Sequence, residues 1–201
     1  MKTIVKSLLC AVLVAAASPV FAAAKKSIVC VTFPEYDWVM NILGNRSSAF
    51  NVTLLQDNGT DLHSYQPSVK DVAKISSCDM LVYVGGESDG WVEKAASNAK
   101  NRNMVVVNLM EVLGDRVREE EIVEGMQAEE EEHHHDGDLD DDDEEDVEYD
   151  EHVWLSLRNA ITLTQYLSER LQELDAANAA SYRANTAAYV RELSALDAAC
   201  G

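Results

Sequence analysis

In the first half of the chain, hydrophobic positions fall into short, almost wholly apolar runs separated by segments with helical spacing. The apolar runs predict four strands, at 27–33, 50–56, 79–86 and 103–109. The intervening segments repeat apolar residues every three to four positions, as helices with one buried face do. Because strands and helices alternate and the strands lack polar alternation, we expect an α/β fold. Its core would be a four-stranded, mainly parallel sheet flanked by helices.

Prolines and glycines indicate where the first helices begin and end. Pro34 suits the first turn of a helix that ends at Gly44, and Pro67 lies near the start of a second helix over 66–78. The second helix is expected to bury one apolar face. That predicted face consists of Val69, Val72, Ala73 and Ile75.

Two more helices are predicted at the carboxyl end of the sequence. Ser156 suits the N-cap of a long amphipathic helix, and Asp175 suits that of an alanine-rich helix whose pattern continues to the last residues. The last helix is expected to leave apolar residues partly bare, which favours a continuation of the chain or self-association. Those residues are Tyr182, Tyr189, Leu193 and Leu196.

Between the strands and the last two helices lies a strongly acidic stretch, 119–151. It holds 20 acidic residues and neither Lys nor Arg, with His133, His134 and His135 embedded in it. Such a composition cannot offset its ordering entropy by burial, so we expect a mobile loop. The loop is either a solvated linker or a segment that gathers cations through its clustered His and acidic side chains, which makes these histidines accessory metal candidates.

The amino-terminal residues 1–22 have the features of an export signal. Lys2 and Lys6 precede a short apolar run, and small residues lie at the expected cleavage site. The run is too short to span a bilayer of about 30 Å. Lipidation at Cys10 is disfavoured because Leu9 is bulky and the apolar run continues past it. We therefore expect an exported chain with no membrane insertion.

The net charge of −20 narrows the classes of partner. A strongly acidic chain repels nucleic acid and anionic lipid, so neither is an expected partner. Cations are the natural ligands. Beyond the signal the sequence has Cys30, Cys78 and Cys200, and we expect the first two to be buried thiols, with one disulfide and one leftover cysteine as the alternative.

Two isolated histidines stand in similar surroundings. His63 lies in the segment DLHSYQP after the second predicted strand, and His152 in DEHVWLS before the long helix. Ligands of open α/β sheets bind outside the carboxyl ends of the strands, where His63 is expected. Each histidine alone is compatible with an ordinary surface position. Together they predict a shared divalent metal, because neutral imidazole is the commonest side-chain metal ligand and zinc sites use it.

Several motifs resemble one family when taken in order. They are TFPEYDWVMNILG, GTDLHSYQPSVKDVAKISSCDMLVYVGG, VVNLMEVLG and DEHVWLSLRNA. Over most of its length the chain is similar to the zinc/manganese ABC-transporter solute-binding proteins, extracytoplasmic receptors that hand a metal ion to a membrane permease. Leu62 and Leu157 depart from the residues usual in that family, but neither replaces a ligand.

The resemblance implies how the chain is divided. Residues 25–174 would form the first α/β metal-binding lobe, which includes the acidic loop, and 175–201 the start of a long inter-lobe helix. His63 and His152 would be metal ligands of this lobe. The second lobe, with the remaining ligands, is expected to be missing from this sequence, which would then be a fragment.

The expected function is capture of Zn(II) in the periplasm and its delivery to an ABC-transporter permease, without catalysis. An acidic, histidine-rich loop is typical of the zinc members, and imidazole ligands favour zinc over Mn(II), which prefers oxygen. Three alternatives stay open. The chain is a manganese-specific member, a metal-storage or adhesin protein that uses the acidic loop, or a zinc hydrolase with Glu151 as base, which the absence of HExxH spacing disfavours.

Overall fold

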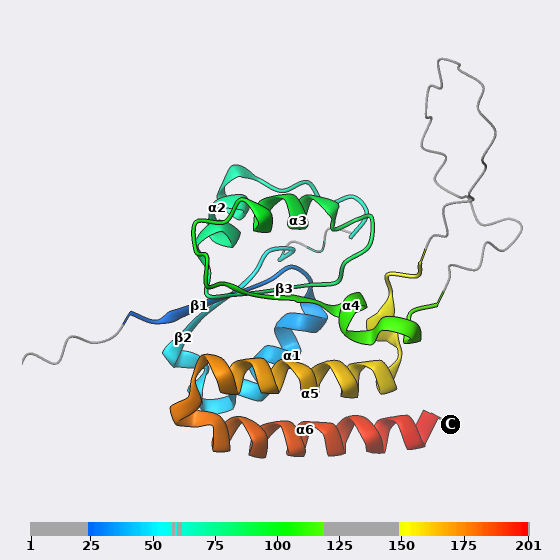
Figure 1. Ribbon diagram of the computed structural model, residues 1–201. Helices are drawn as coiled ribbons and strands as arrows, with labels where there is room; N and C mark the ends of the chain where they lie inside the picture. Colours follow the sequence, from blue (N-terminus) through cyan, green and yellow to red (C-terminus); the bar gives the residue numbers. More distant parts are fainter. Residues whose placement is uncertain (1–23, 58, 60–61, 119–148, 201) are drawn as a thin grey trace, which may run out of the picture.

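The computed structural model describes residues 24–57, 59, 62–118 and 149–200. A four-stranded, fully parallel sheet with strand order β2-β1-β3-β4 lies between two layers of helices (Figure 1). Its strands are β1 Lys26–Cys30, β2 Phe50–Leu54, β3 Met80–Tyr83 and β4 Val105–Asn108. The predicted parallel sheet is confirmed, with each strand shorter than its apolar run.

Six α-helices accompany the sheet in the described part of the chain. They are α1 Phe33–Leu43, α2 Val69–Ser77, α3 Gly90–Ser97, α4 Leu109–Leu113, α5 Leu157–Leu174 and α6 Ala179–Cys200. Helices α2 and α3 cover one face of the sheet, while α1 and α5 cover the other and α6 lies outside α5 (Figure 1). Of the described helices, none is long and apolar enough to cross a membrane.

Alternate residues of the central strands feed two separate hydrophobic cores. In β1, Ile28 and Cys30 pack with α1, α5 and α6, whereas Val29 packs with α2 and α3. Because successive side chains of a strand point to opposite faces, near-continuous apolar runs are what a sheet covered on both sides requires. Cys30 and Cys78 are buried free thiols in different cores, as predicted.

Helix α1 has Pro34 in its first turn and ends at Gly44, as predicted from the sequence. At the start of the helix, the Glu35 carboxylate accepts the backbone N–H of the N-cap residue Thr32 at 2.9 Å, as in one half of a capping box. The helix ends at Gly44, which has φ +53°. The amide of Asn185 in α6 donates to the carbonyl of Ile42 at 2.9 Å, so the last helix caps the first one.

Helix α6 packs against α1 and α5, and the expectation that Tyr182 is partly bare is wrong. The side chain of Tyr182 is fully buried, and its hydroxyl donates to Asp175 at 2.5 Å. Tyr189 is partly buried and donates to Asp37 of α1 at 2.8 Å. Tyr189 and Leu193 are partly bare as expected, and Leu196 is 50% exposed. The hydroxyl groups of Tyr182 and Tyr189 both have hydrogen-bond acceptors at the edge of the core, so both rings can pack inward.

The predicted inward face of α2 is also wrong, except for Ile75. Val69 is 88% exposed and Val72 39%, while Ile75 is completely buried. Two stripes of helical spacing exist in this segment, and the stripe through Asp71, Ile75 and Cys78 faces the sheet. Hydrophobicity alone disfavours that stripe because it contains an acid.

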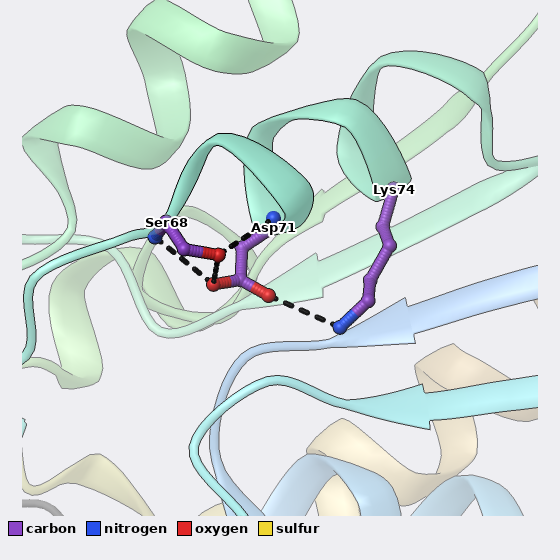
Figure 2. A network of polar contacts seen from close by, with 3 residues as sticks. All are labelled: Ser68, Asp71 and Lys74. Atoms are coloured by element: carbon purple, nitrogen blue, oxygen red, sulfur yellow. Dashed lines mark hydrogen bonds and ion pairs between the residues drawn. The ribbon is translucent and has the colours of Figure 1, made fainter.

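The acid at position 71 is explained by a polar network at the start of α2 (Figure 2). The Asp71 carboxylate accepts from the backbone N–H of Ser68 at 3.0 Å and from its hydroxyl at 2.6 Å. Lys74 forms an ion pair with the other carboxylate oxygen at 3.0 Å. A capping box of this kind fixes the helix start and therefore the side that meets the sheet.

Candidate metal site

The imidazole rings of His63 and His152 meet at the carboxyl edge of the sheet. Their centroids lie 5.6 Å apart and the ring planes are inclined at 51°. His63 follows β2, and His152 immediately precedes the 3-10 turn Val153–Leu155 that leads into α5. The structure thus brings together the two histidines that the sequence singled out. His133, His134 and His135 lie outside the described residues.

His63 is presented to solvent by buried neighbours. Leu62 is buried, and the Tyr65 ring packs 5.7 Å from the Trp91 ring of α3. The N–H of Tyr65 donates to the carbonyl of Leu62 at 3.4 Å, which closes a tight turn. Because the residues on both sides of the turn are anchored in the core, His63 between them points outward at a fixed place.

The loop after β3 holds the His63 ring. The hydroxyl oxygen of Ser88 lies 2.8 Å from Nδ1 of His63. Nothing in the sequence pattern singled out Ser88, so its contact with His63 was not predicted. The only available signal was its position, since Ser88 follows the strand next to β1, where the direction of strand progression reverses and ligands bind.

His152 is held by the acid two residues before it. Asp150 accepts from the backbone N–H of His152 at 2.8 Å and contacts Nδ1 of its ring at 3.0 Å. Glu151 and Val153 on either side are buried, and the Trp154 ring packs 5.3 Å from the imidazole. Ser156 caps α5 as predicted, accepting the N–H of Asn159 at 3.4 Å.

This arrangement suits a metal ion bound through the Nε2 atoms. A metal-binding histidine commonly presents its other ring nitrogen to an oxygen, which fixes ring orientation and tautomer. Here Nδ1 of His63 contacts Ser88, and Nδ1 of His152 contacts Asp150. With a Zn–N bond of about 2.1 Å and a tetrahedral angle, two ligating rings have centroids roughly 5 Å apart. The observed separation of 5.6 Å is close to that value.

Two imidazoles alone make an incomplete coordination shell. Within the described ranges there is no group of three or more His, Cys, Asp or Glu side chains that could hold a metal. Zinc sites use four protein ligands, or three with an open position. The described residues therefore supply half of a site.

The segments that follow β1 and β3 contain two buried acids that the sequence interpretation did not identify. Glu35 accepts the N–H groups of Val31 and Thr32, both at 2.9 Å, and Asp89 accepts those of Val84 and Gly85 at 2.9 and 3.1 Å. Burial raises the pKa of Glu35 well above its usual range and that of Asp89 to about 6. The sequence did carry one signal, because TFPE at 32–35 fits the capping-box pattern.

Glu151 is the acid nearest the site in sequence. It is 7% exposed, and its Oε1 accepts the backbone N–H of Ser88 at 2.9 Å. A general base for hydrolysis must reach the reacting water. A buried carboxylate already committed to a backbone N–H is poorly placed for that role.

A groove of about 890 Å³ is lined in part by His152. Its lining includes Arg116, Arg118 and Arg158 as well as Asp115 and Asp150. Three guanidinium groups disfavour a bound cation. The histidine pair therefore stays the candidate metal site.

Residues 28–200 match the family model described as ZnuA, zinc-uptake complex component A, periplasmic. The chain belongs to this family. The resemblance inferred from the sequence motifs is thereby confirmed.

Individual relatives agree with the family. The zinc-binding lipoprotein AdcA of Streptococcus pneumoniae is 31% identical over 192 residues, which cover 95% of this chain and 35% of AdcA. The metal ABC transporter substrate-binding lipoprotein ScbA of Streptococcus cristatus is 29% identical over 178 residues, covering 86% of this chain and 49% of ScbA. The chain thus spans about a third to a half of the length of these relatives.

Solved structures give the same result for the fold. Zn(II)-bound AdcA from Streptococcus pneumoniae superposes with a TM-score of 0.64 at 27% identity, covering 87% of this chain and 32% of AdcA. The Mn2+ complex of FpvC from Pseudomonas aeruginosa has a TM-score of 0.63 at 26% identity, covering 87% of this chain and 55% of FpvC. The predicted α/β lobe is confirmed.

Proposed function

We propose that this chain takes part in the extracytoplasmic capture of Zn(II) and its delivery to the permease of an ABC transporter. One observation carries the proposal. The rings of His63 and His152 converge at the carboxyl edge of the sheet, each with its Nδ1 against an oxygen. Capture and release require no covalent chemistry, so we infer a binding protein and not an enzyme.

Zinc is favoured over manganese by the donor atoms. Imidazole suits zinc, whereas manganese prefers carboxylate, carbonyl and water oxygens. The family description and AdcA both name zinc, and the Mn2+ complex of FpvC keeps manganese as the second candidate. A direct comparison of the two ions is therefore part of the test.

We infer that residues 25–174 act as a first lobe and that 175–201 begin the helix that leads to a second lobe. Coverage of about a third to a half of the relatives supports this division. Holding zinc near 1 nM requires about 12 kcal/mol of binding free energy, more than two imidazoles and water are expected to supply. The described lobe should therefore bind zinc with lower affinity than a site completed by further ligands. The proposed signal, 1–22, lies outside the described residues.

Competition titration with a chromophoric chelator tests the proposal. His63→Ala and His152→Ala are each expected to weaken zinc binding at least about tenfold, because each removes one of two protein ligands. A triple variant with His133, His134 and His135 changed to alanine is the matched control and should retain most of the affinity. Mn(II) should compete weakly with zinc in the unaltered chain.

The opposite pattern would overturn the proposal. If the loop variant loses zinc while His63→Ala and His152→Ala keep it, the acidic loop is the binding element and a storage or adhesin role is correct. Turnover of ester or peptide substrates by the zinc-loaded chain, lost in Glu151→Gln, would establish the hydrolase alternative instead.

A further inference from the structure

We propose that Ser88 sets the tautomer of His63 and that Glu151, through Ser88, keeps the two metal-binding histidines in register. This inference rests on the proposed function, since it concerns residues that position the ligands. Ser88 and Glu151 do not themselves bind the metal in this proposal. They are positioning residues.

The geometry makes Ser88 the junction of three loops. Its hydroxyl oxygen lies 2.8 Å from Nδ1 of His63, in the loop after β2. Its backbone N–H donates at 2.9 Å to Oε1 of Glu151, which directly precedes His152. His63 is therefore hydrogen-bonded to Ser88, and Ser88 to Glu151, which is the neighbour of His152 in the chain. This series connects two imidazoles from distant parts of the sequence.

Burial gives the link to Glu151 its strength. The side chain is only 7% exposed, and a hydrogen bond to a carboxylate is roughly twice as strong as one between neutral groups. Gly86 lets the carboxylate pass, because it has φ +79° and a Cβ at this position would overlap the Glu151 side chain. The backbone of the loop after β3 thus leaves space for the Glu151 side chain.

The proton on His63 follows from the hydrogen-bonding capacity of serine. Binding of a metal through Nε2 requires the ring proton to be on Nδ1, where it donates to the Ser88 hydroxyl oxygen. A hydroxyl can accept this bond because it has two lone pairs in addition to its own proton. Alanine at position 88 removes the acceptor that stabilises this tautomer, while the backbone N–H that binds Glu151 stays in place.

A purely structural role for Ser88 predicts a different result. Ser88 precedes Asp89, the N-cap residue of α3, so its replacement could act through the stability of that helix. Loss of helix stability would not change which nitrogen of His63 carries the proton. The tautomer therefore separates the two explanations.

The test uses the full chain with Ser88→Ala, Ser88→Thr and, as control, Ser97→Ala. Ser97 is the last residue of α3, is exposed, and its hydroxyl donates to the carbonyl of Lys94 at 3.0 Å. Side-chain 15N–1H correlation spectra of the metal-free and zinc-loaded chains report the tautomer of each histidine. Zinc affinity is measured by chelator competition, and thermal unfolding verifies that each variant is folded.

Ser88→Ala is expected to alter the His63 signals and to weaken zinc binding by about 10- to 100-fold, the usual effect of losing such a partner. Ser88→Thr should restore both properties because it keeps the hydroxyl, and Ser97→Ala should resemble the unaltered chain. Glu151→Ala should weaken zinc binding while leaving the His63 tautomer unchanged.

Unaltered His63 signals together with unaltered zinc affinity in Ser88→Ala would overturn the inference. Equal losses of affinity in Ser88→Ala and Ser97→Ala would also overturn it. If the unaltered chain itself fails to bind zinc, the proposed function is wrong. In that case the metal-free spectra still decide whether Ser88 controls the His63 tautomer.

Discussion

The carboxylate of Glu151 crosses directly over the backbone of Gly86, where any side-chain carbon would overlap it. Gly86 has φ +79°, a conformation that L-residues with a side chain rarely adopt. One glycine therefore satisfies two conditions at once. It turns the chain after β3, and it leaves room for the acid that is adjacent to His152.

Gly86→Ala is expected to destabilise the chain by about 1–3 kcal/mol through backbone strain and to displace Glu151. Displacement breaks the 2.9 Å hydrogen bond to Ser88, so zinc affinity should fall as well. Gly114→Ala is the control, because Gly114 has φ +51° but nothing lies within 4 Å of a Cβ there. Denaturant unfolding and zinc titration should show strain in both variants and loss of affinity only in Gly86→Ala. Equal zinc affinity in the two variants would contradict this expectation.

Asp89 makes stability depend on pH. Burial raises its pKa from 3.8 to about 6, so between these values the folded chain binds a proton that the unfolded chain has released. The free-energy cost of keeping the Asp89 carboxyl buried is absent below about pH 4. It grows as the pH rises toward 6 and reaches roughly 3 kcal/mol. Stability should accordingly decrease with rising pH over this window.

Asp89→Asn removes the titrating group and keeps an oxygen for the N–H groups of Val84 and Gly85. Urea unfolding at several pH values should therefore give a flatter stability curve between about pH 4 and 7 than that of the unaltered chain. Asp115→Asn, the same change at an exposed acid that does not act on Asp89, should leave the curve unchanged. Parallel curves for Asp89→Asn and the unaltered chain would show that Asp89 does not cause the dependence.

The strand pattern predicted the sheet because a strand buried on both faces must be apolar at nearly every position. All of β3 is apolar and buried, as are the last three residues of β1. The strand pattern also placed His63 at the correct edge, since loops after parallel strands meet there. The inward face of α2 could not be predicted, because the stripe that faces the sheet contains an acid. Asp71 is stable there because it accepts hydrogen bonds from Ser68. The spacing of apolar residues shows which positions are hydrophobic, but it does not show which polar residues cap a helix.

The partners of the two histidines differ in how far sequence could reveal them. Asp150 is close to His152 in the chain, so local reasoning can propose the pair. Ser88 meets His63 only through the packing of separate loops, and no sequence spacing encodes that distance. Tyr182 was misjudged for the same reason, because its burial depends on how α6 packs against α1 and α5.

Helix α2 provides a test of which stripe is buried. Ile75→Ala should cost about 2–5 kcal/mol, because it leaves a cavity in a fully buried position. Val69→Ser should change stability by no more than about 0.5 kcal/mol, since the side chain is 88% exposed. The measurement is equilibrium unfolding in denaturant. Comparable losses from both changes would restore the face predicted from sequence.

Tyr182→Phe tests whether α6 is part of the folded lobe. The change keeps the buried ring and removes the hydroxyl that donates to Asp175 at 2.5 Å, which should cost roughly 2 kcal/mol because the acceptor is a carboxylate. Tyr149→Phe, at a residue 49% exposed, is the matched control and should be nearly neutral. If thermal unfolding gives the same midpoint for both variants, the contact between α6 and the preceding turn does not contribute to stability.

Zinc should stabilise the lobe against heat in proportion to its binding. A ligand at 100 times its Kd adds about 2.7 kcal/mol, which corresponds to a rise in Tm of roughly 5–11 °C for a chain of this size. A chelator should reverse the rise, and acidification from about pH 8 to 5 should reduce it because protons compete with zinc for imidazole. His63→Ala and His152→Ala should show little rise at the same zinc concentration. A full rise in either variant would mean that the converging rings of His63 and His152 are not where zinc binds.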